Sequence, residues 1–357
     1  MSRRSTDIGM QTIGLDVGDR KSVGVVLDGA GKVVEEFSVP STEGGLDRGF
    51  GHREPCRVAL EVGTHSPWMA RRLGTMGHEV LVANARKVAL ISRGGKKTDR
   101  VDAETLARLA RMDPKLLFPI RHRGPEARRD LTLIRSRDAL VAARTQLVNH
   151  VRQQVKVWGA RLPSCSTEAF ARKASEQIPA ELRDALSPIV EQIASLSGGI
   201  RDYDRRVNAL CSERYPETGC LRQVAGVGPL TSLCFVLTLE DPSRFVRGRD
   251  VGAYLGLTPR KHDSGDRAPE LRISKAGDAT LRRLLVGAAH YVLGPFGPDT
   301  ALRRWGAELG RRGRKNAKKR AVVAVARKLS VLLLSLWRSG EVYEPLRGAS
   351  KELAASA

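Results

Sequence analysis

The sequence predicts an α/β domain at the N-terminus followed by a mainly helical remainder. Strand-like and helical runs alternate over residues 1–120, whereas long apolar repeats with helical spacing begin after Pro125. Hydrophobic residues make up 41% of the 357 residues, which is enough to bury a core in each of two or three domains. We therefore expect an α/β domain joined to one or two helical domains.

Five strand-like runs alternate with turns and helices in the first part of the chain. They span residues 11–18, 22–27, 32–39, 57–63 and 78–84. Residues 28–31 read Asp-Gly-Ala-Gly, a strong signal for a β-hairpin between the second and third runs. A helix is predicted over residues 66–76, and another follows the basic loop 93–97. The order βββ-α-β-α-β-α is that of the ribonuclease H fold.

Four acidic residues occupy related places in this pattern: Asp16, Glu61, Asp99 and Asp102. The first two lie on strand-like runs, and the other two share one face of the helix that Thr98 can cap. Acids in a first helical turn are also favoured by the helix dipole alone, so that pair by itself indicates no site.

Four carboxylates on one scaffold nevertheless favour a metal site. Unit charges about 4 Å apart repel by roughly 4 kcal/mol at an effective dielectric near 20, so clustered acids protonate or hold cations. Oxygen ligands suit Mg²⁺, with Mn²⁺ as a possible substitute. The pattern therefore predicts phosphoryl transfer on nucleic acid, with metal ions stabilising the attacking and leaving oxygens.

A rival interpretation starts from Asp16-Val-Gly18 followed by a hairpin, which is similar to the first phosphate loop of actin-like and sugar-kinase ATPases. The later half of the sequence has no second Asp-x-Gly phosphate loop and no Gly-Gly adenosine loop. A net charge of +22 is also unusual for a small-molecule kinase. The ATPase interpretation is therefore disfavoured.

Residues 121–215 are expected to form a coiled-coil helical region. One series of apolar residues repeats every seven residues to about Trp158, and a second, from Leu182 to Leu210, has spacings that alternate between three and four. Gly198-Gly199 weakens the second helix, and Pro188 behind Ser187 is a candidate for its true start. The two helices could pair within one chain or with another subunit, and the pattern does not decide between these.

Residues 216–345 are expected to form a mainly helical C-terminal domain, followed by a tail at 346–357. Residues 223–232 resemble a helix-hairpin-helix turn, which could bind phosphate or be a plain connector. Residues 252–277 form a polar, basic loop that contains Ser264 and Ser274. A serine there could be a nucleophile or a phosphate-binding hydroxyl. The apolar run 321–337 is predicted to be a buried or amphipathic helix.

The charge balance points to a polyanionic partner. Lys and Arg number 61 against 39 Asp and Glu, whereas aromatic residues are only 4%, so phosphate contacts should contribute more than base stacking. A charge run is often only a solvated face, but in this chain we expect contact with nucleic acid. The residues expected to make these contacts are Lys96, Lys97, Arg260, Lys261, Arg272, Lys275, Arg314, Lys315, Lys318 and Lys319.

The sequence also suggests the compartment. No signal peptide, lipidation motif or membrane-spanning run is evident, so we expect a cytoplasmic, nucleoid-associated protein without a membrane partner. The five cysteines are scattered, with no Cys-x-x-Cys pair and no zinc-finger spacing. They are expected to be reduced thiols.

Several motifs together identify a family. The chain contains the following, in this order: Ile13-Gly-Leu-Asp16, Leu60-Glu61, Gly63-Thr64, Lys97-Thr-Asp99, Asp102-Ala103, Val224-Ala-Gly-Val-Gly228, Gly256-Leu-Thr-Pro-Arg260, Ser264-Gly265, and Arg272-Ile-Ser-Lys275 with Gly277. Their order and spacing resemble the DEDD transposases of bacterial insertion sequences, the insertion-sequence "one-ten" family of RNA-guided recombinases. The resemblance covers nearly the whole chain.

The resemblance implies a RuvC-like N-terminal domain, a coiled-coil insert and a C-terminal transposase domain. In that family the acids corresponding to Asp16, Glu61, Asp99 and Asp102 hold Mg²⁺, and the serine corresponding to Ser264 attacks DNA to form a covalent phosphoserine. The active site is composite, in a homo-oligomer of dimers that assemble to a tetramer. A non-coding bridge RNA pairs with donor and target DNA, which leaves shape and backbone contacts to the protein.

Two departures from the family pattern stand out: Ser66 occupies a place where the family often has Tyr, and residues 265–271 contain few glycines. Two alternatives to the full mechanism remain open. One is a metal-only, resolvase-like nuclease in which water attacks and Ser264 binds phosphate. The other is a non-catalytic scaffold that binds nucleic acid and keeps a vestigial acid cluster.

Overall fold

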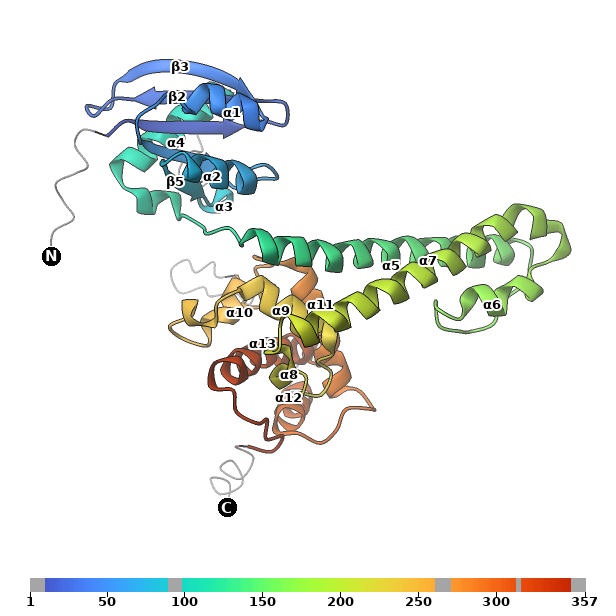
Figure 1. The fold of residues 1–357 in the computed structure, drawn as a ribbon. Coiled ribbons are helices and arrows are strands. Elements are labelled where there is room, and N and C mark those ends of the chain that lie inside the picture. The colour runs from blue at the N-terminus through green and yellow to red at the C-terminus, as the bar shows by residue number, and fades with distance from the viewer. Residues whose placement is uncertain (1–9, 89–97, 261–270, 313–315, 348–357) are drawn as a thin grey trace. The chain divides into compact units, whose positions relative to one another are not determined.

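The structure is a computed structural model that describes residues 10–88, 98–260, 271–312 and 316–347. The chain divides into two compact units, residues 1–122 and residues 123–357 (Figure 1). The first unit contains the sheet, and the second is helical. Each unit has its own hydrophobic core.

A mixed sheet forms the centre of the first unit. Its strands are β1 (Thr12–Val17), β2 (Lys21–Leu27), β3 (Val33–Pro40), β4 (Arg57–Glu61) and β5 (Glu79–Ala83). The spatial order is β3-β2-β1-β4-β5, with β1 antiparallel to β2 and parallel to β4. The turn at Asp28 forms as expected, because its carboxylate accepts hydrogen bonds from the N–H groups of Ala30 and Lys32. The five strands predicted from sequence are confirmed.

Helices cover both faces of this sheet. They are α1 (Glu43–Phe50), α2 (Ser66–Thr75), α3 (Ala85–Val88) and α4 (Asp99–Met112), followed by the 3₁₀ turn η1 (Pro114–Leu117). Phe50 of α1 and Met69 of α2 pack against Ile13 and Leu15 on one face. The α4 helix packs on the other face. The alternation of side chains along each strand therefore divides the core into two layers.

The contact between α4 and β1 is unusually close. A Cβ atom at Gly14 would lie 1.9 Å from the carbonyl oxygen of Ala103 and 2.6 Å from the nitrogen of Ala107. Both are backbone atoms of α4, so the helix lies directly on the strand with no side chain between them. Ala103 and Ala107 are fully buried there. Small residues on both elements allow this approach.

The second unit begins with two long helices that form a hairpin, α5 (Pro125–Val157) and α7 (Ala180–Glu213), with α6 (Phe170–Ala174) and the 3₁₀ turn η2 (Ser175–Gln177) between them. The two helices pack side by side in one chain (Figure 1). The proposed start of α7 at Pro188 is wrong, because the helix begins at Ala180 and continues through the proline. Burial of Leu186 and Val190 on either side of Pro188 stabilises that turn.

The remaining helices form a bundle. They are α8 (Thr218–Leu221), α9 (Pro229–Leu239), η3 (Pro242–Arg244), α10 (Asp250–Tyr254), α11 (Ala279–Leu293), α12 (Ala301–Arg311) and α13 (Ala317–Ser339). The α13 helix contains the apolar run 321–337 and buries one side of it, as predicted. In the part of the chain that the structure describes, no helix is long and apolar enough to cross a membrane. All five cysteines are unpaired.

The turn between α8 and α9 has a packing role. Gly226 has a φ of +83°, and a Cβ atom there would lie 3.0 Å from the carbonyl oxygen of Ala288 in α11. The α9 helix that follows is buried along nearly its whole length. These contacts favour the connector interpretation of residues 223–232 over the phosphate-binding one.

Replacing Gly14 with alanine should destabilise the first unit by roughly 3 kcal/mol, because the added methyl group would collide with backbone that cannot move aside. Gly74→Ala is the matched control, since nothing lies within 4 Å of a Cβ at that helical position. The control should be neutral or slightly stabilising. Urea unfolding followed by circular dichroism measures both, and equal stabilities would contradict the close contact.

Candidate active site

Asp16 and Glu61 lie side by side at one edge of the sheet. In the parallel pairing of β1 with β4, Leu15 is opposite Leu60, so the next residue on each strand is one of the two acids. Gly14 and Ala59 face α4, and side chains two residues further along a strand share that face. Both carboxylates therefore belong to the α4 face, at the carboxyl ends of their strands.

The direction of α4 brings the other two acids to the same edge. Arg57 begins β4 and donates a hydrogen bond from Nη1 to the carbonyl oxygen of Ala110, near the end of α4, at 3.3 Å. Ala103, nearer the start of α4, contacts Gly14. The helix therefore runs opposite to β1 and β4. Its first turn, which contains Asp99 and Asp102, lies towards the carboxyl ends of the two strands.

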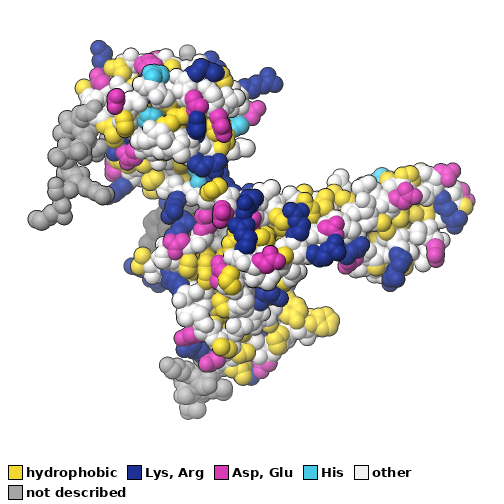
Figure 2. Space-filling view, in the orientation of Figure 1, with side chains coloured by type: hydrophobic (Ala, Val, Ile, Leu, Met, Phe, Trp, Pro, Cys, Tyr) yellow, Lys and Arg dark blue, Asp and Glu magenta, His cyan; other side chains and the backbone are white. Residues whose placement is uncertain are grey.

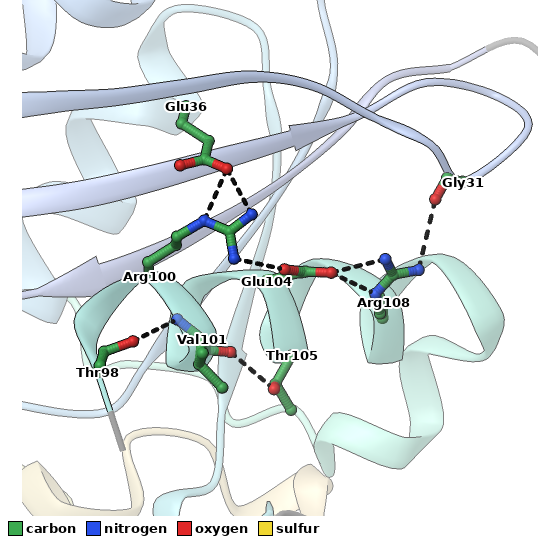
Figure 3. A network of polar contacts seen from close by, with 8 residues as sticks. All are labelled: Gly31, Glu36, Thr98, Arg100, Val101, Glu104, Thr105 and Arg108. Carbon is green, nitrogen blue, oxygen red and sulfur yellow. Dashed lines mark hydrogen bonds and ion pairs between the residues drawn. The ribbon is translucent and has the colours of Figure 1, made fainter. Parts of the chain in front are cut away.

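The first turn of α4 is capped as the sequence predicts. The Thr98 hydroxyl accepts a hydrogen bond from the N–H of Val101 at 3.3 Å (Figure 3). Asp102 is half-buried, whereas Asp99 is exposed. One carboxylate is thus partly enclosed by the fold, and the other is open to solvent.

One ion pair and one hydrogen bond join α4 to the β2–β3 hairpin. Arg100 bonds to Glu36 of β3 at 2.7 Å and to Glu104 at 3.3 Å, and Glu104 also bonds to Arg108 at 2.8 Å (Figure 3). The Arg108 guanidinium donates to the carbonyl oxygen of Gly31 at 3.4 Å. The hydrogen bond from Arg100 holds the pKa of the Glu36 carboxyl below its ordinary value. Glu104 is therefore paired with two arginines and has a structural role, unlike the metal-binding role expected of Asp99 and Asp102.

The donor chemistry fits a hydrated divalent cation, but the acids do not enclose one. Among the residues with described positions, no group of three or more His, Cys, Asp or Glu side chains is close enough to hold a metal ion. The four carboxylates share an edge and supply only oxygen, the donor that Mg²⁺ prefers.

A histidine that sequence reasoning missed joins the segments after the two strand acids. His65 follows Glu61 by four residues, and its Nε2 is 3.2 Å from Oδ1 of Asp19 in the β1–β2 turn. Trp68 donates from Nε1 to His65 Nδ1 at 3.0 Å. Because indole only donates, Nδ1 is unprotonated, and Nε2 carries the hydrogen that bonds to Asp19. The Gly-Thr-His-Ser run at residues 63–66, separated from Glu61 by Val62, was the available sequence signal.

Ser66, where the family often has Tyr, closes the turn after β4. Its hydroxyl donates to the carbonyl oxygen of Gly63 at 2.9 Å and accepts from the Gly63 N–H at 3.0 Å. It also lies 3.0 Å from Nε2 of His122. The serine therefore holds this turn together from inside, which is a structural role.

Ser264 and Lys261 lie outside the described residues, but the neck of their loop is described. The N–H of Arg260 donates to the carbonyl oxygen of Arg272 at 3.0 Å, and the N–H of Ser274 donates to that of Thr258 at 2.8 Å. These bonds form a short antiparallel ladder. Ser274 belongs to this ladder through its backbone N–H, so it helps to hold the two ends of the loop together.

One arginine of α11 supports both sides of this neck. Arg282 donates from Nη1 to the carbonyl oxygens of Leu255 at 3.0 Å and Ala276 at 2.7 Å. Gly256 and Gly277 both have positive φ values, and Cβ atoms there would collide with neighbouring backbone. The two ends of the loop are therefore held at fixed positions on the C-terminal bundle.

The predicted basic contacts are partly visible. Arg260, Arg272 and Lys275 are exposed around the neck, and Lys318 and Lys319 are exposed in the first turn of α13. None of these five forms an ion pair with another residue that the structure describes. Cations in a first helical turn are unfavourable for the helix dipole unless an anion is near. Lys96, Lys97, Arg314 and Lys315 lie outside the described ranges.

Comparison with known families matches both halves of the chain. A family model described as a transposase, of the DEDD class in the IS110 group, matches residues 13–158. A second, described as transposase IS116/IS110/IS902 family, matches residues 219–302. The first range contains all four acids, and the second contains Ser264.

Individual relatives agree with this. The chain is 30% identical over 312 residues to a putative transposase, y4pF/y4sB, of Sinorhizobium fredii, covering 85% of this chain and 78% of that protein. It is 30% identical over 314 residues to a probable family 20 transposase of Pseudomonas aeruginosa, covering 83% and 88%. It is 29% identical over 240 residues to the transposase for insertion sequence element IS1328 of Yersinia enterocolitica, covering 66% and 70%. The chain therefore belongs to the IS116/IS110/IS902 family of insertion-sequence transposases.

Proposed function

We propose that this transposase cuts and rejoins the DNA of its own insertion element, with a RuvC-like ribonuclease H domain in residues 1–120. The observation that carries the proposal is the placement of Asp16, Glu61 and the first turn of α4 at one edge of the sheet. The strand order β3-β2-β1-β4-β5, with β1, β4 and β5 parallel, supports the fold assignment. The family membership supports DNA cleavage and joining as the activity.

The four acids are proposed to bind Mg²⁺ or Mn²⁺. A divalent cation there would stabilise charge on the attacking and leaving oxygens of a phosphodiester. Asp16 and Glu61 come from adjacent strands, so the sheet fixes their separation. The half-buried Asp102 is oriented by a capped turn, and Asp99 stays open towards solvent, where substrate can approach.

Asp102→Asn should abolish cleavage of labelled element-junction DNA and weaken Mn²⁺ binding, because the amide keeps the shape of the side chain but loses its charge. The thermal unfolding of the variant should match that of the wild type. Glu104→Gln is the matched control on the same helix, since Glu104 pairs with Arg100 and Arg108. It should retain cleavage and Mn²⁺ affinity.

Removal of divalent metal with EDTA should likewise stop cleavage and leave DNA binding largely intact. The non-catalytic scaffold would be favoured instead if neither the Asp102→Asn substitution nor metal removal changed nucleic-acid binding and the function of the protein.

Ser264 is proposed to be the nucleophile. Its Oγ would form a bond to a DNA phosphorus while the bond from that phosphorus to a deoxyribose oxygen breaks, and the released hydroxyl takes up a proton. In rejoining, a deoxyribose hydroxyl would attack the phosphoserine and return the serine hydroxyl. The ladder at Arg260 and Arg272 and the bonds of Arg282 support this role, because they fix both ends of the loop.

Ser264→Ala should abolish a covalent protein–DNA adduct seen on a denaturing gel of wild-type protein incubated with its RNA, Mg²⁺ and junction DNA. Ser274→Ala, the other serine of the segment, should still form the adduct, because Ser274 pairs through its backbone N–H. Clean cleavage without an adduct in the wild type and in Ser264→Ala would favour the metal-only, resolvase-like nuclease.

Guidance by a bridge RNA and assembly of dimers into a tetramer complete the proposal. The net charge of +22 and the exposed cations around the loop neck support binding of DNA and RNA backbones. The low aromatic content fits a protein that leaves base recognition to RNA pairing. Strand exchange that requires RNA transcribed from beside the gene would support the guide, and equal exchange without RNA would contradict it.

A further inference from the structure

The hairpin of α5 and α7 has a polar waist between two apolar cores. The core shared with the bundle includes Ile134 of α5 and Val207 of α7. The core nearer the hairpin end starts at Val148 and Ile193 and includes Phe170 of α6. We use "waist" for the segment between them, with Arg137 and Arg144 on α5 and Ser197 and Asp204 on α7. Polar residues thus occupy the positions where the repeat of the hairpin would place apolar ones.

The two arginines of the waist differ in their partners. Arg137 bonds to Asp204, with its Nε 2.6 Å from Oδ1 and its Nη2 3.3 Å from Oδ2. Arg144, seven residues later, meets Ser197, seven residues earlier on α7, and donates from Nη1 to its Oγ at 3.1 Å. Among all residues with described positions, no carboxylate pairs with Arg144. Its Nε is buried and has no hydrogen-bond acceptor.

This arrangement leaves a buried charge uncompensated. Arg144 is only 9% exposed, and its guanidinium remains protonated in any protein environment. A buried ion without a counter-ion is strongly unfavourable, whereas an apolar residue in its place is neutral or stabilising. Fixing the register of the hairpin is one use of a buried polar group, but Arg137 and Asp204 already supply that. An anion from outside this chain would therefore balance the positive charge of Arg144 at the waist.

The residue after Ser197 adds no side chain to the surface of α7. The nearest atom to a Cβ at Gly198 is Nη2 of Arg201 at 4.0 Å, whereas Leu140 of α5 lies 3.1 Å from a Cβ at Gly199. The Ser197 hydroxyl donates to the carbonyl oxygen of Ile193 at 2.9 Å, so it can hold the Arg144 guanidinium in place as an acceptor. Arg201 is 59% exposed, and its own acid partner, Glu168, is 3.7 Å away.

We propose that Arg144, oriented by Ser197 and assisted by Arg201, binds a backbone phosphate of nucleic acid at the waist of the hairpin. The planar fork of an arginine matches phosphate oxygens and gains most where water is partly excluded. The visible face of the hairpin carries Lys and Arg side chains interspersed with Asp and Glu (Figure 2). A carboxylate from a second copy is disfavoured because that copy is itself strongly basic, at +22. The inference rests on the proposed binding of DNA and RNA.

The test compares Arg144→Met with the wild type in fluorescence anisotropy, using labelled single-stranded poly(U) RNA and a labelled duplex DNA over a series of salt concentrations. Loss of one phosphate contact should reduce the slope of log affinity against log salt by about 0.7 for the RNA or about 0.9 for the duplex. The probe that shows the reduction identifies the source of the phosphate. The melting temperature of Arg144→Met should be equal to or higher than that of the wild type, since an apolar side chain replaces an unpaired charge.

Two further variants separate a specific contact from loss of charge. Arg205→Met removes one cation from the same hairpin, but Arg205 is 79% exposed and pairs with Asp202. Its salt slope should stay close to that of the wild type. Arg144→Lys keeps the charge but loses the fork, so its affinity should lie between those of the wild type and Arg144→Met.

Three outcomes would overturn the inference. A wild-type salt slope for Arg144→Met with both probes would mean that no phosphate binds there. A lower melting temperature for Arg144→Met would make Arg144 a structural residue that the fold already satisfies. Loss of oligomers in sedimentation with an unchanged salt slope would assign the anion to a carboxylate of a second copy. If the wild type binds neither probe, the proposed nucleic-acid function fails together with the inference, whereas failure of Arg144→Met alone leaves that function standing.

Discussion

The direct backbone contact between Gly14 of β1 and Ala103 of α4 is the constraint on which the N-terminal unit depends. Side chains normally separate a helix from a sheet, and here the small residues remove that layer at one point. Ala103 and Ala107 on the helix and Gly14 on the strand set both the distance and the direction of α4. Asp16 lies two residues after Gly14, and Asp102 and Asp99 lie one and four residues before Ala103, so the positions of these three acids follow from the contact.

Two kinds of interaction hold α4 against the sheet. The apolar contact fixes how close the helix lies, whereas the pair of Arg100 with Glu36 and the hydrogen bond of Arg108 to Gly31 fix its rotation on the exposed side. Exposed ion pairs contribute little to stability, so their effect is mainly orientation. Neither Asp99 nor Asp102 takes part in these pairs, which is compatible with the metal-binding role proposed for them.

Much of the N-terminal site could be predicted from the sequence because its signals are local. Asp28 and the glycines specify a hairpin, Thr98 specifies a helix start, and the order of elements brings strand ends and helix together. The link from His65 to Asp19 could not be predicted, since it joins residues 46 positions apart through a tautomer set by Trp68. Contacts of that kind depend on the folded geometry and have no periodic pattern.

The helical unit was less accessible to sequence reasoning. The seven-residue repeat predicted two pairing helices but not their partners, and the structure shows that α5 pairs with α7 of the same chain. The α7 helix also continues through Pro188, because tertiary packing outweighs the lost hydrogen bond. Arg144 occupies a core position of that repeat, so periodicity alone would have assigned it an apolar neighbour. Only the folded structure shows that this arginine is buried and that its Nε has no hydrogen-bond acceptor.

The polar waist has a further consequence for how the hairpin moves. Among the residues that the structure describes, Val148, Val151, Phe170 and Ile193 belong to a cluster that has no member in common with the bundle core. A segment with its own small core forms a separate cooperative unit, whose amide protons exchange through local opening that leaves the rest folded. The end of the hairpin can thus rearrange when a large substrate arrives, while the neck of the serine loop on the bundle keeps its geometry.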